Sequence, residues 1–249
     1  MGGLRLIPLG VGDAFSERWY SSALALEHEG RILLVDCPHP MRKMLRDASI
    51  GTGLQLTSDR IEAVFVTHLH ADHASGLESF AYAMHFGLGQ RLTLACHPEV
   101  ARRLWEGHLA AGMEQILPAV GAPFEARKLE DWFDVVPVDE TRSVRLGAFT
   151  VRCRRTIHHI PTAAVRVRAG GRELGYSADT AFDPSLIAWL AEADLVVHET
   201  NHGVHTPYAS LAALPADLRA RMRLIHYPDD FDVSGSAIAV LKQARVQEV

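Results

Sequence analysis

Three of the 14 histidines lie in one short segment, His68-Leu69-His70-Ala71-Asp72-His73, directly after the apolar run of residues 61–67. The run predicts a buried strand, and the alternation of side chains at its end places His68 and His70 on one side, where both can bind one cation. Asp72 and His73 turn onto the following helix and face a neighbouring point. The segment therefore predicts ligands for two metal ions.

Three other expected strands also end in groups that bind metals. They are followed by the pair His158 and His159, by Asp179 and by His226. Taken singly, a carboxylate at a strand end is usually a helix cap, and a histidine is usually a hydrogen-bonded polar residue. Taken with the first cluster, these residues complete two coordination shells.

Short apolar runs alternate with turns along the whole chain, and residues 112–137, with three prolines, fit no element. The pattern predicts one domain over residues 1–249, a layered sandwich with helices outside two sheets. Strands are expected over 4–9, 22–27, 31–36, 61–67, 92–96, 143–156, 162–169, 174–177, 195–198 and 224–225. Helices are expected over 41–48, 72–82 with an acidic cap, 99–111, 184–191, 214–222 and 236–244.

The charge balance argues against several classes of partner. The 25 Lys and Arg against 30 Asp and Glu leave a net charge of −5, which removes the long-range attraction that general nucleic-acid binders use.

No apolar run reaches the roughly 18 residues of a membrane span, and the first residues lack a secretory signal, so the cytoplasm is the expected location. Cys37, Cys96 and Cys153 are widely separated, and we expect buried apolar residues rather than disulfides or zinc thiolates.

The segment His68-x-His70-x-Asp72-His73, preceded by an apolar strand and Thr67, resembles the signature of the metallo-β-lactamase superfamily. The similarity runs from about residue 6 to residue 231, and segments 10–16 and 33–37 resemble the opening strands of its ribonuclease Z and small-phosphodiesterase branch. Two departures are that Ala178 stands where glycine is common, and that Pro38-His39 follows Asp36-Cys37 where a glycine is usual.

The resemblance implies an αββα sandwich, two mixed sheets flanked by helices, with two metals at the rim of the sheets. It implies a division of the ligands between His68, His70 and His158 on one metal, Asp72, His73 and His226 on the other, and Asp179 as the bridge. His159 competes with His158, and the family pattern favours His158.

Two divalent cations about 3.5–4 Å apart lower the pKa of a bridging water and stabilise an oxygen anion formed during attack, which predicts a hydrolase. Imidazole and carboxylate ligands without thiolate suit Zn²⁺, and Mn²⁺ or Fe²⁺ are compatible. Family usage makes zinc the first choice.

The bond that is cut depends on the proton donor for the leaving group. His205, in His205-Thr206-Pro207, resembles the non-ligand His-Ser/Thr motif of the phosphodiesterase branch, so His205 is the predicted general acid. Asp72 is the other predicted catalytic residue. The segment His198-Glu199-Thr200 resembles the branch's His-Glu-Ala-Thr motif, in which Glu199 would orient a neighbouring histidine. His198 is expected to be structural, and the sequence assigns no role to His39 or His202.

Ribonuclease Z carries a long arm for transfer RNA between its bridging aspartate and the His-Glu-Ala-Thr segment, and this chain has room there for one short helix. We therefore expect a small phosphodiester substrate, such as a cyclic nucleotide or cyclic phosphate, and neither a membrane nor stably bound nucleic acid as partner. Residues 15–20 offer rings for base stacking, and residues 112–137 would either cap the site or form a homodimer contact. The alternatives are a ribonuclease Z-like endonuclease and a lactone, β-lactam or thioester hydrolase of the same fold.

Overall fold

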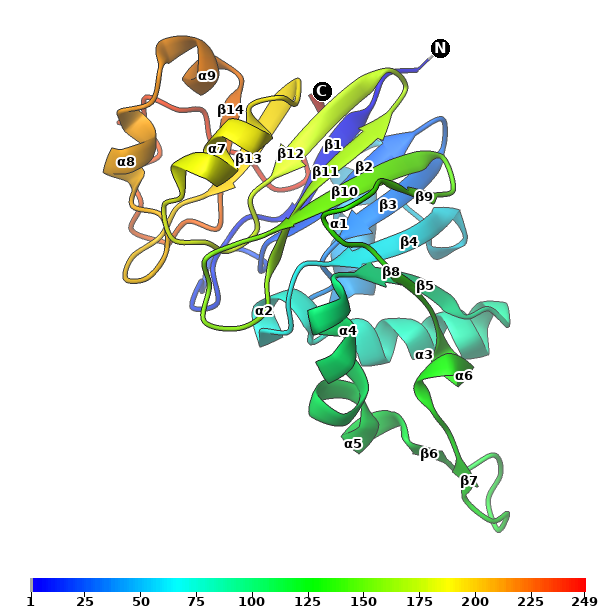
Figure 1. The fold of residues 1–249 in the computed structure, drawn as a ribbon. Helices are drawn as coiled ribbons and strands as arrows, with labels where there is room; N and C mark the ends of the chain where they lie inside the picture. Colours follow the sequence, from blue (N-terminus) through cyan, green and yellow to red (C-terminus); the bar gives the residue numbers. More distant parts are fainter. Residues whose placement is uncertain (1) are drawn as a thin grey trace.

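The computed structural model describes residues 2–249 and shows two mixed sheets packed face to face, with helices on both outer faces (Figure 1). The predicted sandwich is confirmed. The seven-stranded sheet has the order β15 (Gln247–Glu248), β1 (Arg5–Gly10), β2 (Ala23–His28), β3 (Arg31–Val35), β4 (Ile61–Val66), β5 (Leu92–Cys96) and β8 (Phe133–Pro137). The six-stranded sheet has the order β14 (Met222–Ile225), β13 (Leu195–Glu199), β12 (Arg172–Tyr176), β11 (Ala163–Ala169), β10 (Phe149–Arg155) and β9 (Val144–Leu146).

Each sheet changes from antiparallel to parallel pairing along its width. In the first sheet β3, β4, β5 and β8 run parallel, and in the second β12, β13 and β14 do. Parallel strands present their carboxyl ends at one edge, and ligands of α/β proteins bind outside such ends. The residues that follow β4, β12 and β14 therefore meet at one rim of the sandwich.

Three apolar layers hold the sheets and helices together. Phe65 and Tyr176 belong to the layer between the sheets. Strands of the first sheet are buried on both faces, so Leu6 packs toward the second sheet and Ile7 toward the helices. A third layer joins the second sheet to α7 (Pro184–Leu190), α8 (Tyr208–Ala212) and α9 (Ala216–Ala220).

Helix α1 (Met41–Thr52) shows how local sequence produces one of these layers. Met41, Met44, Leu45 and Ala48 recur at helical spacing and are all buried. The helix continues beyond the predicted end to Gly53, whose positive φ of 74° forms the left-handed cap that favours glycine.

The helix predicted over 72–82 is wrong in its bounds and its cap. The chain forms α2 (Ala71–Ala74) and then α3 (Leu77–Leu88), and the cap residue of α2 is His70, so Asp72 lies in the first turn. The break falls at Gly76, where a Cβ atom would lie 2.5 Å from the Pro38 carbonyl oxygen. Close packing against that loop interrupts the helix.

Residues 98–137 contain more structure than the sequence indicated. The predicted helix 99–111 is divided into α4 (Pro98–Leu104), a π-helical turn η2 (Trp105–Leu109) and α5 (Ala110–Met113). A hairpin of β6 (Gln115–Ile116) and β7 (Glu125–Ala126) projects from the body (Figure 1), and α6 (Leu129–Trp132) leads into β8. Strand β8 was not predicted, because its pairing with β5 depends on residues far away in the sequence.

The prediction of a closing helix over 236–244 is wrong. This segment runs beside β14, where the Leu224 amide donates to Ala239 O at 2.9 Å and the Leu241 amide donates to Leu224 O at 2.9 Å. Ile238 and Leu241 are buried by this pairing. Extended pairing at the sheet edge satisfies the backbone and buries the branched side chains, so it prevails over helical spacing.

Two smaller corrections concern turns. The strand predicted over 143–156 is a hairpin of β9 and β10, because Gly147 turns the chain with a φ of 55°. The helix predicted over 214–222 is the shorter α9, and α8 before it was not predicted. The short turn η1 (Ser58–Arg60) precedes β4.

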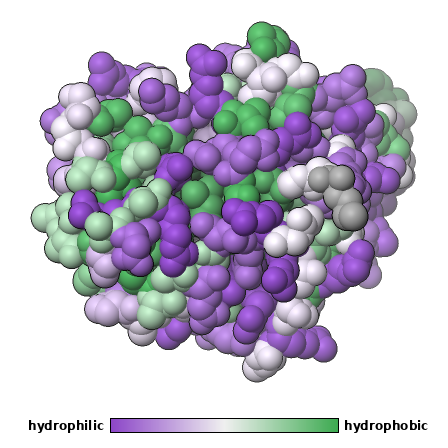
Figure 2. All heavy atoms as spheres, turned by 90° about the horizontal axis from the view of Figure 1, so that it is seen from above, coloured by the Kyte–Doolittle hydropathy of each residue, from purple (hydrophilic) through white to green (hydrophobic). Residues whose placement is uncertain are grey.

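Within residues 2–249, no helix is long and apolar enough to cross a bilayer. On the face seen in Figure 2, apolar side chains gather in patches that polar side chains separate. Cys37, Cys96 and Cys153 are free and buried, as predicted. That residues 1–249 fold as one domain remains a prediction.

Candidate metal centre

The residues with predicted metal-binding roles reach one rim of the sandwich from four strand ends. The segment from His68 to His73 follows β4 and continues into α2, and Asp179 follows β12. His158 and His226 follow β10 and β14. Segments far apart in the sequence therefore supply a single site.

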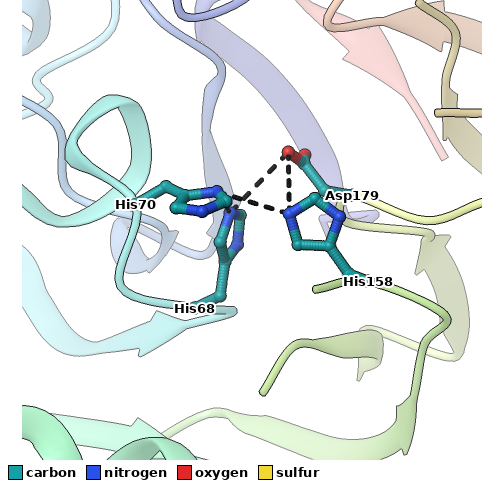
Figure 3. A group of neighbouring side chains, drawn as sticks. All are labelled: His68, His70, His158 and Asp179. Atoms are coloured by element: carbon teal, nitrogen blue, oxygen red, sulfur yellow. Dashed lines mark hydrogen bonds and ion pairs between the residues drawn. The ribbon is translucent and has the colours of Figure 1, made fainter. Parts of the chain in front are cut away.

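The first cluster consists of His68, His70, His158 and Asp179, whose nitrogen and oxygen atoms lie within 4.8 Å of one another (Figure 3). His70 Nδ1 lies 3.0 Å from His68 Nε2 and 3.3 Å from His158 Nε2. The carboxylate oxygen Asp179 Oδ2 lies 3.7 Å from His68 Nε2. Three imidazoles and one carboxylate thus point at a common position.

The second cluster consists of Asp72, His73 and His226, again within 4.8 Å. Asp72 Oδ2 lies 3.3 Å from His73 Nε2 and 3.2 Å from His226 Nε2. Asp179 faces this cluster with its other oxygen, because Asp179 Oδ1 lies 3.3 Å from His73 Nε2. The two oxygens of Asp179 are thus divided between the clusters, which is the arrangement expected of a bridging ligand.

Buried atoms without partners show that the site fits bound cations. His73 Nε2 and Asp179 Oδ1 are buried and make no hydrogen bond, and they contact each other at 3.3 Å inside the second cluster. A buried polar atom without a hydrogen bond costs about 1–3 kcal/mol, so its retention indicates a group that it serves. Imidazole and carboxylate donors suit divalent metals, so the residues fit a pair of them. The assignment of individual ligands remains a prediction.

A buried carboxylate that the sequence analysis gave no role lies behind the second cluster. Asp36 Oδ2 is 2.7 Å from His73 Nδ1, and Asp36 Oδ1 accepts hydrogen bonds from the Thr67 amide and hydroxyl at 2.8 and 2.9 Å. The Thr67 hydroxyl also lies 2.9 Å from His68 Nδ1. Such contacts fix the orientation of ligand rings. Asp36 ends a buried strand, but only its pairing with His73 shows what it does.

The protonation of the imidazoles differs between the clusters. Burial lowers the pKa of His68 well below its ordinary value, and lowers that of His158 to about 4, so both are neutral and have a free lone pair at neutral pH. Burial would also lower the pKa of His73 and His226, but carboxylates overcome it. Asp179 and Asp36 raise the pKa of His73 well above the ordinary value, and Asp179 and Asp72 raise that of His226 to about 9. Cation binding at the second cluster therefore displaces protons.

Three residues that enter or leave the metal-facing segments sit in left-handed backbone conformations. Asp36, Ala178 and His226 have φ values of 64°, 51° and 58°. Such conformations cost a residue with a side chain about 1–3 kcal/mol and gather at functional sites. The φ of Ala178 explains why related sequences commonly have glycine there.

His205 joins the site from the loop after β13. His205 Nδ1 lies 2.9 Å from Glu199 Oε1, which also accepts from the Thr180 amide at 2.8 Å. His205, Asp179 and His226 form a further group within 4.8 Å. The hydrogen bond to Glu199 raises the pKa of His205 above its ordinary value. Glu199 thus orients His205, in the manner that the sequence suggested for a neighbouring histidine.

The remaining histidines are placed as follows. His159 is exposed, and its ring packs 4.6 Å from the ring of His70 without joining a cluster, so the structure brings His158 and not His159 to the first cluster. His198 is buried, with Nδ1 2.7 Å from the Glu199 carbonyl oxygen, and faces neither cluster. His39 and His202 are exposed outside the clusters.

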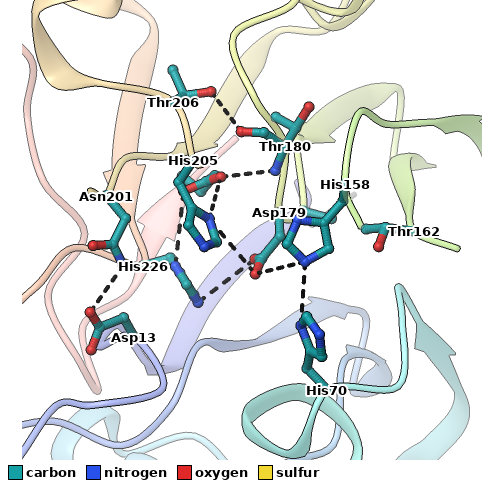
Figure 4. Close-up of polar contacts among 12 residues, drawn as sticks. Asp13, His70, His158, Thr162, Asp179, Thr180, Asn201, His205, Thr206 and His226 are labelled. Carbon is teal, nitrogen blue, oxygen red and sulfur yellow. Dashed lines mark hydrogen bonds and ion pairs between the residues drawn. The ribbon is translucent and has the colours of Figure 1, made fainter. Parts of the chain in front are cut away.

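A cavity of about 390 Å³ opens over the clusters. Asn201 and Asp13 lie on its wall beside His226, and Asn201 Nδ2 donates to Asp13 Oδ2 at 2.9 Å (Figure 4). The lining residues are Asp13, Ala14, Phe15, His70, Ala71, Asp72, His159, Asp179, Asn201, His205 and His226. Asp13 and Asn201 were missed by the sequence analysis, since each looks like an ordinary loop residue until the two meet.

A family model described as anti-Pycsar protein Apyc1 matches residues 4–246. The anti-Pycsar protein Apyc1 of Paenibacillus sp. (strain J14) is 31% identical over 254 residues, which cover 99% of this chain and 98% of that protein. The chain belongs to the Apyc1 family. Apyc1 proteins from Bacillus phages are among its relatives as well, one of them, from Bacillus phage 010DV004, 30% identical over 249 residues that cover 92% of this chain and 91% of that protein.

Solved structures show the same fold. The metallo-β-lactamase fold protein YhfI from Bacillus subtilis matches the whole of both chains with a TM-score of 0.76 at 17% identity. Human tRNase Z, short form, matches 98% of each chain with a TM-score of 0.68 at 24% identity. The resemblance to the metallo-β-lactamase superfamily is therefore confirmed. So is the prediction of a metal-dependent hydrolase that acts on phosphodiester bonds.

Proposed function

We propose that this Apyc1 family member is a dinuclear phosphodiesterase that opens a small cyclic phosphodiester, a cyclic nucleotide or cyclic phosphate. The observation that carries the proposal is the position of His205, which Glu199 holds 2.9 Å away and which lies beside Asp179 and His226. A proton donor next to two metal-binding clusters is what a diester with a poorly acidic leaving oxygen requires.

The chain's own residues divide the remaining work. His68, His70 and His158 would hold one cation, Asp72, His73 and His226 the other, and Asp179 would face both. Bound there, the cations would supply Lewis acidity and lower the pKa of water. Zinc is our first choice, because the donors are mostly imidazole, and Mn²⁺ or Fe²⁺ are compatible.

His205 is the general acid in this proposal. Its Nδ1 faces Glu199, so Nε2, on the opposite edge of the ring, carries the proton that the leaving alkoxide receives. Glu199 is buried and favours the protonated imidazole. Asp72 helps to place His226 and His73, each within 3.3 Å of Asp72 Oδ2, around the reacting phosphate.

The small size of the substrate is supported by the chain between Asp179 and His198. This stretch forms α7, of seven residues, which packs on the second sheet, and then enters β13, so it supplies no long arm for transfer RNA. The net charge of −5 works against a polyanion. We propose further that the protein acts in the cytoplasm, binds neither a membrane nor nucleic acid stably, and uses the 112–137 region for a homodimer contact or a cap.

The test is a panel of substrates offered to protein loaded with Zn²⁺ or Mn²⁺. It contains 3′,5′- and 2′,3′-cyclic nucleotides, bis-p-nitrophenyl phosphate, a precursor transfer RNA, a lactone and a β-lactam. We expect turnover of the cyclic nucleotides and the activated diester. Efficient, correctly placed removal of a transfer-RNA 3′ trailer would instead support a ribonuclease Z-like enzyme, and turnover of the lactone or β-lactam alone would contradict the phosphodiesterase assignment.

A further inference from the structure

Phe15 stands at the mouth of the cavity over the clusters, and 89% of its surface is exposed. The other residues that line this cavity are polar, charged or alanine. A single exposed apolar side chain is ordinary on a protein surface, but this one borders the same cavity as Asp72, Asp179 and His205. A substrate bound at the clusters would lie within the reach of its ring.

The backbone, rather than side-chain packing, holds Phe15 in place. The Phe15 amide donates to Asp13 Oδ1 at 2.9 Å, and Asn201 fixes the other oxygen of Asp13. On the far side of the loop, the Ser16 hydroxyl donates to Asp229 Oδ1 at 2.6 Å and the Glu17 amide donates to Asp229 Oδ2 at 2.9 Å. Two buried or partly buried anchors thus present an apolar ring to water.

The close approach of the loop depends on Gly12. A Cβ atom at Gly12 would lie 2.6 Å from the Ser16 side chain, so a larger residue would displace the loop that carries Phe15. Neighbouring aromatic residues have other tasks. Tyr20 packs against the core of the first sheet and donates its hydroxyl to Asp47 Oδ2 at 2.9 Å, and Trp19 does not line the cavity.

We infer that Phe15 is the base-binding face of the substrate site, so that the base of a bound cyclic nucleotide stacks on its ring. This inference rests on the proposed function. The polar wall suits a phosphate and ribose hydroxyls, whereas the ring of Phe15 suits the face of a base, since stacking on an aromatic ring accepts every base. Phe15 determines specificity and leaves the chemistry of the phosphodiester to other residues.

The experiment compares a 3′,5′-cyclic nucleotide with the methyl glycoside of ribose 3′,5′-cyclic phosphate, which has the same diester without a base. In the Phe15→Ala variant, kcat/KM for the cyclic nucleotide should fall about 5- to 150-fold, mainly through KM, because one stacked base is lost. The base-free diester should react as it does with the unchanged protein. Phe15→Trp should restore the preference for the cyclic nucleotide over the base-free diester. Phe15→Leu, which is apolar without a ring, should restore less of this preference.

Phe86→Ala is the matched control, since Phe86 is 65% exposed but lies on α3, outside the cavity. It should leave the ratio of the two substrates unchanged. Equal losses on both substrates in Phe15→Ala, or no loss on either, would overturn the inference. If the unchanged protein hydrolyses neither cyclic diester, the proposed function itself fails. This result is distinct from the outcomes that would overturn the role of Phe15 alone.

Discussion

The two clusters of the candidate metal centre differ in charge although they share Asp179. The first has three imidazoles, of which His68 is buried and neutral. The second has two imidazoles and the carboxylate of Asp72, and Asp36 lies behind His73 as a further buried carboxylate. One side of the centre therefore offers mainly neutral nitrogen donors, and the other combines imidazole with negative charge.

This difference indicates unequal tasks. Neutral imidazoles bind zinc without losing protons, whereas the second cluster must release the protons that its carboxylates hold on His73 and His226. His205 lies between the clusters, with its ring 5.4 Å from that of His226 and 5.5 Å from that of His158. The proposed proton donor is therefore close to both clusters.

The largest effect is expected at the residue that the clusters share. Asp179→Ala should lower activity by on the order of 10³-fold or more and reduce the metal content of both clusters, because several kcal/mol of charge stabilisation depend on the cations. Elemental analysis of the purified variant beside kinetics checks this. Loss of a single metal would show that Asp179 serves one cluster only.

His205→Ala should separate proton donation from metal binding. The variant should keep its metals and lose on the order of 10²–10⁴-fold in rate on a diester with an alkoxide leaving group. The loss should be much smaller with p-nitrophenolate, which leaves without a proton. His226→Ala, the matched ligand variant, should slow both substrates alike. Equal losses on both substrates in His205→Ala at unchanged metal content would assign His205 to substrate positioning.

A smaller effect is expected behind the second cluster. Asp36→Asn keeps the shape of the side chain but removes the charge that orients His73, so metal affinity or activity should fall about 10- to 100-fold. Metal titration should show weakened binding at one of two sites. Asp47→Asn is the control, because Asp47 belongs to neither cluster and accepts a hydrogen bond from the Tyr20 hydroxyl. An equal loss at both sites would contradict the division into two unequal clusters.

Much of the site could be predicted because its residues follow apolar runs. His68, Asp179 and His226 each come after a strand whose burial is evident from composition, and strand ends meet at one rim. Asp36 and the Asp13–Asn201 pair could not be given roles, because their partners lie far away in the sequence. Local sequence contains no information on such contacts.

The errors in the fold have the same cause. Residues 236–244 have apolar spacing that suits a helix, yet their backbone pairs with Leu224 in β14. Strand β8 is short and completes a sheet that begins far from it along the chain. Gly76, the N-cap residue of α3, packs on the Pro38 carbonyl, a contact that no local pattern indicates.

The central claim is that both clusters bind a metal during catalysis. Chelator-treated protein should be titrated with Zn²⁺ or Mn²⁺ while metal content and hydrolysis of a cyclic nucleotide are measured on the same samples. We predict that activity rises until two divalent ions are bound per chain and is then constant. Full activity with one ion bound per chain would contradict the account.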